Sequence, residues 1–146
     1  MTSALPDALA EIRDEFLALG QQERLQLLLE FSNELPELPE RYQGHPDLFE
    51  RVAECQSPVF LFVEVDDADV VQLFVTAPKE SPTTRGFASI LVQGLAGLTS
   101  AEVLAVPDDY PQTIGLSQAV SPLRLRGMAA LLGRTKHQVL LKRRAA

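Results

Sequence analysis

Two apolar segments separated by a short acidic stretch constrain the fold more than any other feature of the sequence. Residues 59–65 and 70–76 are rich in Val and Phe, residue types that are typical of β-strands. Residues 66–69 between them, Asp-Asp-Ala-Asp, favour a polar turn. The pattern therefore predicts an antiparallel β-hairpin. The acidic stretch lacks the glycine and the ligand spacing of an EF-hand loop, so we expect a solvated turn there instead of a calcium site.

Helical patterns precede the hairpin. Apolar residues recur at helical spacing in residues 5–19 and again in residues 25–35. Gly20 is expected to cap the C-terminus of the first helix, and Pro36 is expected to stop the second. The connection between them is short, which predicts a helical hairpin.

Further helices are expected after the hairpin. Ser-Pro pairs at residues 81–82 and 121–122 are typical of an N-cap followed by proline at the first helical position. Thr99 or Ser100 should cap a short helix that ends near residue 104. Residues 106–120, rich in Pro, Asp and Gly, should form a connection.

This order of elements predicts an α+β fold, with the helices packed on a small antiparallel sheet. Two strands alone are marginally stable, so we expect a third strand from residues 38–55. The chain has 146 residues, of which 46% are hydrophobic, enough for one sizeable core. We therefore expect a single domain over residues 1–146.

The charge distribution argues against nucleic acid as a partner. The net charge is −7, and residues 1–109 hold all 20 acidic side chains. Such a body repels phosphate, and the basic residues of the last helix do not form one stripe. The longest uncharged stretch, residues 86–101, is too short to span a bilayer comfortably, and the start of the chain lacks the features of a secretory signal. We expect a cytoplasmic protein without membrane contact.

Sequence motifs for nucleotide or metal chemistry are absent. The chain has no phosphate-binding loop, dinucleotide fingerprint or His-Glu-x-x-His pattern. One cysteine excludes an internal disulfide, and two distant histidines do not have the spacing of a metal site. We therefore expect no bound cofactor and no metal, which leaves the lone thiol as the candidate for chemistry.

Cys55 precedes the first predicted strand, within Glu54-Cys55-Gln56-Ser57-Pro58. A lone cysteine is often a buried structural residue, but polar neighbours and a loop position also suit covalent chemistry. The carboxylate of Glu54 should raise the pKa of the thiol and so lower its reactivity. The residues alone leave both interpretations open.

Two alternative functions follow from these two interpretations. In one, the chain is an interaction or scaffold module in which Cys55 is incidental. In the other, Cys55 is the nucleophile of a thiol enzyme and needs His45 or His137 beside it. A thiol that receives an atom from an already activated sulfur of a partner needs less activation of its own.

Four motifs in order resemble the SufE family of sulfur acceptors. The similarity extends from about residue 23 to residue 132 and surrounds the only cysteine. The motifs are Leu35-Pro36-Glu37-Leu38-Pro39-Glu40-Arg41-Tyr42, Cys55-Gln56-Ser57, Arg85-Gly86, and Ser121-Pro122-Leu123-Arg124-Leu125-Arg126-Gly127-Met128.

The resemblance implies a fold like that of iron–sulfur scaffold proteins of the IscU type. It also implies that Cys55 accepts persulfide sulfur from a pyridoxal-phosphate-dependent cysteine desulfurase of the SufS type and passes it to iron–sulfur scaffold proteins. Glu54, Gln56 and Ser57 would then belong to the loop that presents the thiol. The sequence leaves open whether two copies form a homodimer.

Two more residues gain expected roles from the resemblance. Arg124 matches the arginine that follows the Ser-Pro cap in the family. Glu80 occupies the place of an acidic residue before the Arg-Gly pair, which implies that it borders the contact with the desulfurase.

The chain also departs from the family pattern. Glu54 replaces the glycine that usually precedes the cysteine, and glycine adopts positive φ without the cost that Glu has. Pro58 and Phe60 replace the usual Gln and Trp, and Thr83 replaces an aliphatic residue. These changes concern the loop and the choice of partner more than the thiol itself.

Overall fold

The predicted β-hairpin forms the larger part of the sheet in the computed structural model, which describes residues 5–144. Strand β2 (Phe60–Val65) pairs antiparallel with β3 (Val71–Thr76) over its whole length. Residues 1–4, where we expect no secretory signal, and residues 145–146 of the predicted domain lie outside the described part of the chain.

The third strand lies where it was expected, between residues 38 and 55. Strand β1 (Glu50–Arg51) pairs antiparallel with β2, so that the strand order is β1-β2-β3. Two 3-10 turns, η1 (Glu40–Tyr42) and η2 (Pro46–Leu48), precede it. The prediction of an α+β fold with a small antiparallel sheet is therefore confirmed.

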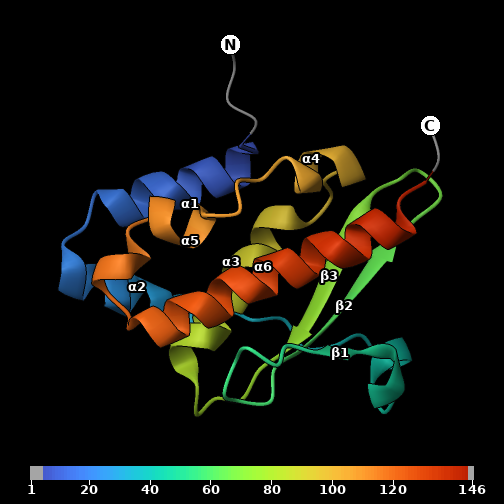
Figure 1. Ribbon diagram of the computed structural model, residues 1–146, viewed down its shortest axis with the longest axis horizontal. Coiled ribbons are helices and arrows are strands. Elements are labelled where there is room, and N and C mark those ends of the chain that lie inside the picture. The colour runs from blue at the N-terminus through green and yellow to red at the C-terminus, as the bar shows by residue number, and fades with distance from the viewer. Residues whose placement is uncertain (1–4, 145–146) are drawn as a thin grey trace.

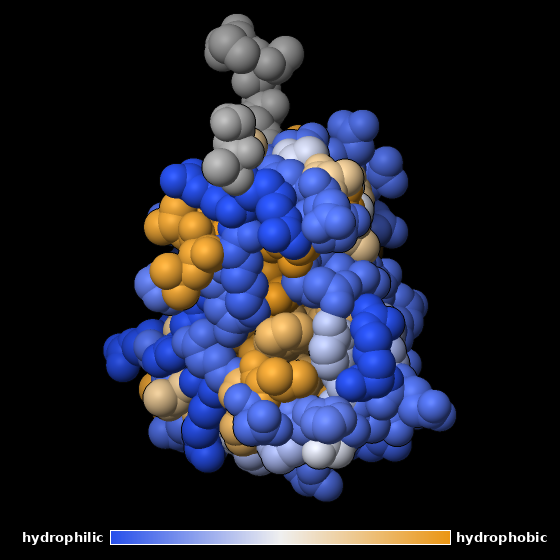
Figure 2. Space-filling model, turned by 90° about the vertical axis from the view of Figure 1, so that its right-hand side faces the viewer, coloured by the Kyte–Doolittle hydropathy of each residue, from blue (hydrophilic) through white to orange (hydrophobic). Residues whose placement is uncertain are grey.

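The sheet has one face toward the helices and one face away from them. In β2 the side chains of Leu61, Val63 and Val65 are buried, while those of Phe60, Phe62 and Glu64 are only partly covered. This alternation follows from the two-residue period of a strand. Figure 2 shows apolar side chains in the middle of one side of the molecule, within a hydrophilic rim.

Helix α3 (Pro82–Leu95) is the centre of the helical layer and packs against α1 (Asp7–Leu17), α2 (Gln21–Ser32), β3 and α6 (Pro122–Lys142). Figure 1 shows α6 running across α3 and the sheet. Helices α2 and α3 approach closely at Gly86, where a β-carbon would lie 2.2 Å from the carbonyl oxygen of Leu28. The backbones of α2 and α3 can therefore pack together only because residue 86 is glycine.

The predicted boundaries of the first two helices need correction. Helix α1 ends at Leu17 with Ala18 as its C-cap, and Gly20 is instead the N-cap of α2, with φ −76°. A glycine that caps a helix C-terminus in the left-handed conformation has positive φ, which Gly20 does not have. Its carbonyl instead accepts the first hydrogen bond of α2, from Arg24 N at 2.9 Å. Helix α2 ends at Ser32, before Pro36, and both helices pack mainly on α3 rather than on each other.

The remaining helical segments follow the predicted order. Thr99 and Glu102 form a capping box at the start of α4 (Ser100–Leu104). The connection after it contains α5 (Tyr110–Thr113) and η3 (Leu116–Gln118). None of the helices in residues 5–144 has both the length and the apolar character needed to cross a membrane.

Candidate functional site

Cys55 lies in the tight loop of residues 52–59 that connects β1 to β2, which we call the cysteine loop. Val52 N donates to Val59 O at 2.9 Å and closes the loop at its base. Inside it, Cys55 N donates to Val52 O at 3.0 Å. Pro58 has no N–H to add to the ladder. The loop therefore begins and ends on the sheet, which fixes where the thiol is held.

The side chain of Cys55 is turned inward against helix α6. It is 5% exposed, and its Sγ lies 3.7 Å from the carbonyl oxygen of Gly127. A β-carbon at position 127 would lie 3.1 Å from that sulfur. The loop can thus rest on α6 because the residue beneath the thiol is glycine.

The surroundings of the thiol disfavour its ionised form. Burial raises the pKa of Cys55 to about 11, and the negative charge of Glu54 adds to the rise. The positive charge of Arg134 acts in the opposite direction and is the weaker influence. The thiol is therefore protonated at neutral pH and a poor nucleophile in this conformation.

A cavity of about 420 Å³ opens beside Cys55. It lies where the loop meets the N-terminal ends of α3 and α6, and the N-terminal ends of helices favour negative charge. Its lining residues are Glu54, Cys55, Gln56, Ser57, Ser81, Thr84, Ser121, Leu123, Arg124 and Gly127.

The two Ser-Pro caps predicted from the sequence differ in the structure. Ser121 caps α6 as expected, because its Oγ accepts from Arg124 N at 3.3 Å. Ser81 precedes α3 but makes no side-chain cap, and its hydroxyl hydrogen-bonds to that of Ser57 in the cysteine loop. The hydrogen bond between Ser57 and Ser81 therefore connects the loop to the start of α3.

The structure brings most of the predicted site residues together. Gln56, Ser57 and Arg124 line the cavity with Cys55, and Nη1 of Arg124 donates to Thr83 Oγ1 at 2.8 Å. Glu80 is exposed and does not line the cavity, although it directly precedes Ser81. The hydroxyl of Thr83, which replaces an aliphatic residue of the family pattern, thus has a partner within the site.

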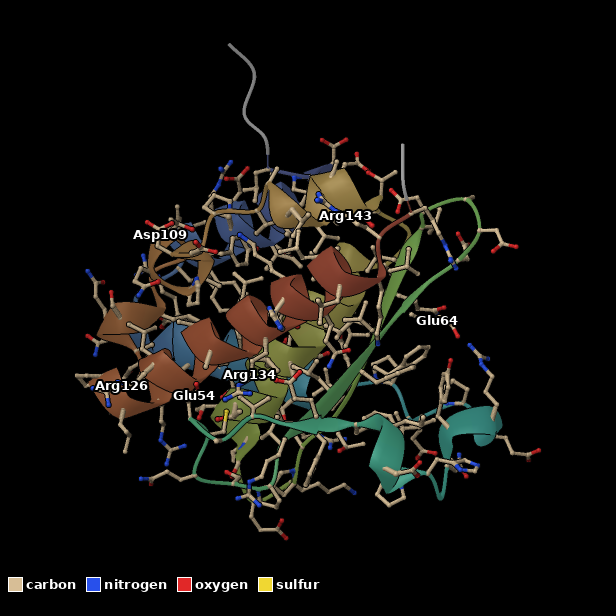
Figure 3. All side chains as sticks on the ribbon, turned by 45° about the vertical axis from the view of Figure 1, so that its right-hand side comes forward. Glu54, Glu64, Asp109, Arg126, Arg134 and Arg143 are labelled. Atoms are coloured by element: carbon tan, nitrogen blue, oxygen red, sulfur yellow. The ribbon has the colours of Figure 1, made fainter. Side chains whose placement is uncertain are left out.

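Glu54 also differs from what its replacement of glycine suggested. Among residues 5–144, Asp69 is the only non-glycine residue with positive φ, so Glu54 has an ordinary backbone conformation. Its carboxylate accepts from Arg134 Nε at 2.8 Å, and Nη1 of the same arginine donates to Glu50 at 2.6 Å. Figure 3 shows Glu54 and Arg134 pointing toward one another from the loop and from α6.

The two histidines are not placed to activate the thiol. His45 lines a different cavity, of about 190 Å³, together with Tyr42 and Phe49. His137 is exposed on α6, and neither histidine lines the cavity beside Cys55. Across residues 5–144, no group of three or more His, Cys, Asp or Glu side chains is arranged to hold a metal ion.

Sequence reasoning missed Arg134 and Gly127 as parts of this site. Arg134 is 80 positions from Glu54, and nothing in the local sequence indicates that they pair. Gly127 had a usable signal, because glycine inside a helical pattern costs about 1 kcal/mol and so suggests a packing requirement.

Comparisons with known proteins agree with this architecture. The family model for SufE, described as an Fe-S metabolism associated domain, matches residues 10–139. A SufE-like protein of Mycobacterium tuberculosis is 49% identical over 137 residues, which cover 94% of each chain. The chloroplastic/mitochondrial SufE-like protein 1 of Arabidopsis thaliana is 28% identical over 129 residues, 88% of this chain and 33% of that relative.

A solved structure gives the same result for the fold. The solution structure of a hypothetical protein from Thermus thermophilus superposes with a TM-score of 0.82 and 36% sequence identity. The superposition covers 94% of this chain and 97% of the other. Family model, relatives and fold agree over nearly the whole length, and the chain belongs to the SufE family of Fe-S metabolism associated domains.

Proposed function

We propose that this protein accepts sulfur on Cys55 from a PLP-dependent cysteine desulfurase of the SufS type and passes it to iron–sulfur scaffold proteins. The observation that carries the proposal is the position of the chain's single cysteine. It lies on a sheet-anchored loop, beside a cavity at the N-terminal ends of α3 and α6. Membership in a family associated with Fe-S metabolism supplies the chemical context.

The proposed step is a transfer of one sulfur atom between two cysteines. The thiolate of Cys55 attacks the terminal sulfur of a persulfide on the desulfurase, and a new S–S bond forms on Cys55. The S–S bond of the donor breaks, its cysteine leaves as a thiolate, and that thiolate takes up the proton that Cys55 lost. No external oxidant or reductant is consumed.

The buried position of Cys55 suits a carrier better than an independent enzyme. Its high pKa keeps the thiol protonated in the free protein and so protects it from unrelated electrophiles. Attack on a persulfide needs the thiolate, so the loop must move into an environment where ionisation is favourable. A docked desulfurase would supply that environment, which makes transfer dependent on the partner.

The cavity beside Cys55 can hold the second sulfur atom of a persulfide. It has room beside Sγ of Cys55, and the N-terminal ends of α3 and α6 border it. These ends favour a negative charge such as that of a persulfide anion. Arg124, which lines the same cavity, adds a positive charge.

Intact-mass spectrometry tests the proposal. Incubation with a cysteine desulfurase and free cysteine should add about 32 Da, one sulfur atom, to the wild-type chain, and dithiothreitol should remove it. Cys55→Ser should gain no mass while keeping the circular dichroism spectrum and desulfurase binding of the wild type. No adduct on the wild type, from a desulfurase shown to release sulfide with dithiothreitol, would contradict the proposal.

A further inference from the structure

One guanidinium connects three separate parts of the molecule. Arg134 extends from α6, and its Nη1 and Nε donate to Glu50 in β1 and to Glu54 in the cysteine loop. The side chains of Arg134 and Glu54 are 30% and 39% exposed, so the contact is partly shielded from water. A hydrogen bond between two ionised groups is stronger than a neutral one, and planar arginine suits this bridging arrangement.

Most of the partners in this network belong to regular elements. Glu50 also accepts from Gln138 Nε2 at 2.8 Å, and Gln138 Oε1 accepts from the backbone N of Val63 in β2 at 2.8 Å. These bonds join α6 to β1 and β2. Among residues 5–144, Glu54 is the member of this network that comes from the loop, so the Glu54–Arg134 bond is the bond of the network that breaks when the loop leaves α6.

We propose that the Glu54–Arg134 ion pair is a latch that holds the cysteine loop closed, with Arg134 as a positioning residue for Cys55. The inference deepens the proposed function, because sulfur transfer requires the thiol to leave the position in which the latch holds it. Where the family pattern has a flexible glycine before the cysteine, this chain has Glu54, whose side chain holds the loop against α6. Opening requires Glu54 to exchange Arg134 for water or for a cation of the partner.

Loss of Arg134 distinguishes a latch from a simple charge effect. The positive charge of Arg134 lowers the pKa of Cys55, while the charge of Glu54 raises it. If charge alone mattered, Arg134→Gln would make the thiol less reactive. If the pair is a latch, the same substitution frees the loop and makes the thiol more reactive, despite its unfavourable effect on ionisation.

The experiment measures the rate of alkylation of Cys55 by iodoacetamide, an uncharged reagent, at pH 8 and low salt. Glu54→Gln and Arg134→Gln should each increase the rate roughly three- to fivefold, which is the effect expected for losing a partly exposed ion pair. The double variant should react little faster than either single variant, because both changes remove the same interaction. Arg134→Lys should give a smaller increase.

Glu50→Gln is the matched control. It removes the charge that Arg134 Nη1 contacts in β1 but leaves the bond between Arg134 Nε and Glu54 in place. The alkylation rate of Glu50→Gln should therefore stay within twofold of the wild type. An Arg134→Gln rate at or below that of the wild type would overturn the proposal. So would an equal increase in Glu50→Gln, because any weakening of the network would then be sufficient. Circular dichroism checks that each variant is folded.

This measurement needs no desulfurase. A failure of sulfur transfer would leave the alkylation results unchanged, and a failure of the latch would leave the mass adduct on Cys55 unchanged. The two proposals can therefore fail separately.

Discussion

Gly127 of helix α6 lies directly beneath the thiol of Cys55, so close that a β-carbon at residue 127 would lie 3.1 Å from Sγ. The same carbon would lie 3.7 Å from Cys55 Cα and 3.8 Å from Glu54 O. The contact therefore involves the backbone of the loop as well as the sulfur. Glycine is normally disfavoured in a helix interior, and the close contact with the cysteine loop explains why residue 127 is glycine.

We expect Gly127→Ala to displace the cysteine loop by a few tenths of an ångström and to loosen its packing on α6. Alanine in a helix interior stabilises by about 0.5–1 kcal/mol relative to glycine, but crowding against Cys55 should cancel that gain. Alkylation of Cys55 should become faster, because the loop then leaves α6 more readily. Urea unfolding and iodoacetamide kinetics measure the two effects.

Gly133 provides the matched control on the same helix. Apart from the neighbouring backbone of α6 itself, no heavy atom of residues 5–144 lies within 4 Å of where a β-carbon at position 133 would be, and the residue is exposed. Gly133→Ala should therefore stabilise the protein by the full helix effect, about 0.5–1 kcal/mol, and leave the alkylation rate unchanged. Equal stabilisation by both substitutions would show that the loop does not press on α6 at Gly127.

The pH dependence of thiol alkylation should report the burial of Cys55. Because its pKa is raised to about 11, the thiolate fraction of the folded protein should rise tenfold per pH unit from pH 7 to 10. In urea the rate should level off near the ordinary thiol pKa. A folded-state rate that levels off below pH 9 would contradict the prediction.

The same shift affects stability at alkaline pH. The unfolded chain releases the thiol proton near 9.0 and the folded protein near 11, so the folded state binds more protons between these values. Stability contributed by the neutral thiol is complete below pH 9 and is lost as pH rises through the folded pKa. Cys55→Ser should lack this part of the decline, which urea unfolding at successive pH values would show.

Arg124 should act on the partner rather than on the free thiol. It is exposed at the cavity, and Thr83 Oγ1 accepts from its Nη1 at 2.8 Å. Within residues 5–144 it forms no ion pair, so its charge is available to an anionic group of a docked protein. Arg124→Gln should slow sulfur acceptance from the desulfurase roughly tenfold, through weaker association.

Arg126 is the control for this prediction. It is exposed two positions further along α6 but does not line the cavity. Arg126→Gln should therefore retain sulfur acceptance within about twofold, since an exposed charge outside an interface contributes little. Both variants should alkylate with iodoacetamide at the wild-type rate. Slower alkylation in Arg124→Gln alone would indicate a role in the resting loop instead.

The fold could be predicted from the sequence because its elements have strong local signals. The Val- and Phe-rich runs of β2 and β3 and the cap at Ser121 required no knowledge of distant residues. Gly20 was misassigned because glycine suits both ends of a helix, and only the observed φ of −76° decides between them. β1 has two residues and pairs through its backbone, so its exact position had no sequence pattern.

The candidate site could be predicted only in part. Cys55 and its loop neighbours are consecutive in the chain, and Arg124 follows a recognisable cap. Arg134 meets Glu54 only after α6 has packed across the sheet, and a charge on an exposed helix face has many equivalent partners in the sequence. Long-range pairs of this kind depend on tertiary structure, which a local pattern does not contain.

The last prediction concerns the two serines that precede prolines. Ser121 caps α6 through its side chain, so Ser121→Ala should cost about 1 kcal/mol of stability and leave the thiol unaffected. The hydroxyl of Ser81 instead bonds to Ser57, so Ser81→Ala should release this end of the cysteine loop. We expect a smaller loss of stability in Ser81→Ala than in Ser121→Ala, because no cap is removed. We also expect Ser81→Ala to alkylate at Cys55 roughly two- to fivefold faster than the wild type, which is the effect of losing one hydrogen bond.

Urea unfolding and iodoacetamide kinetics on both variants measure the contrast. If Ser81→Ala lost as much stability as Ser121→Ala and alkylated at the wild-type rate, the serine would act as an ordinary cap and the Ser57 bond would have no part in holding the loop.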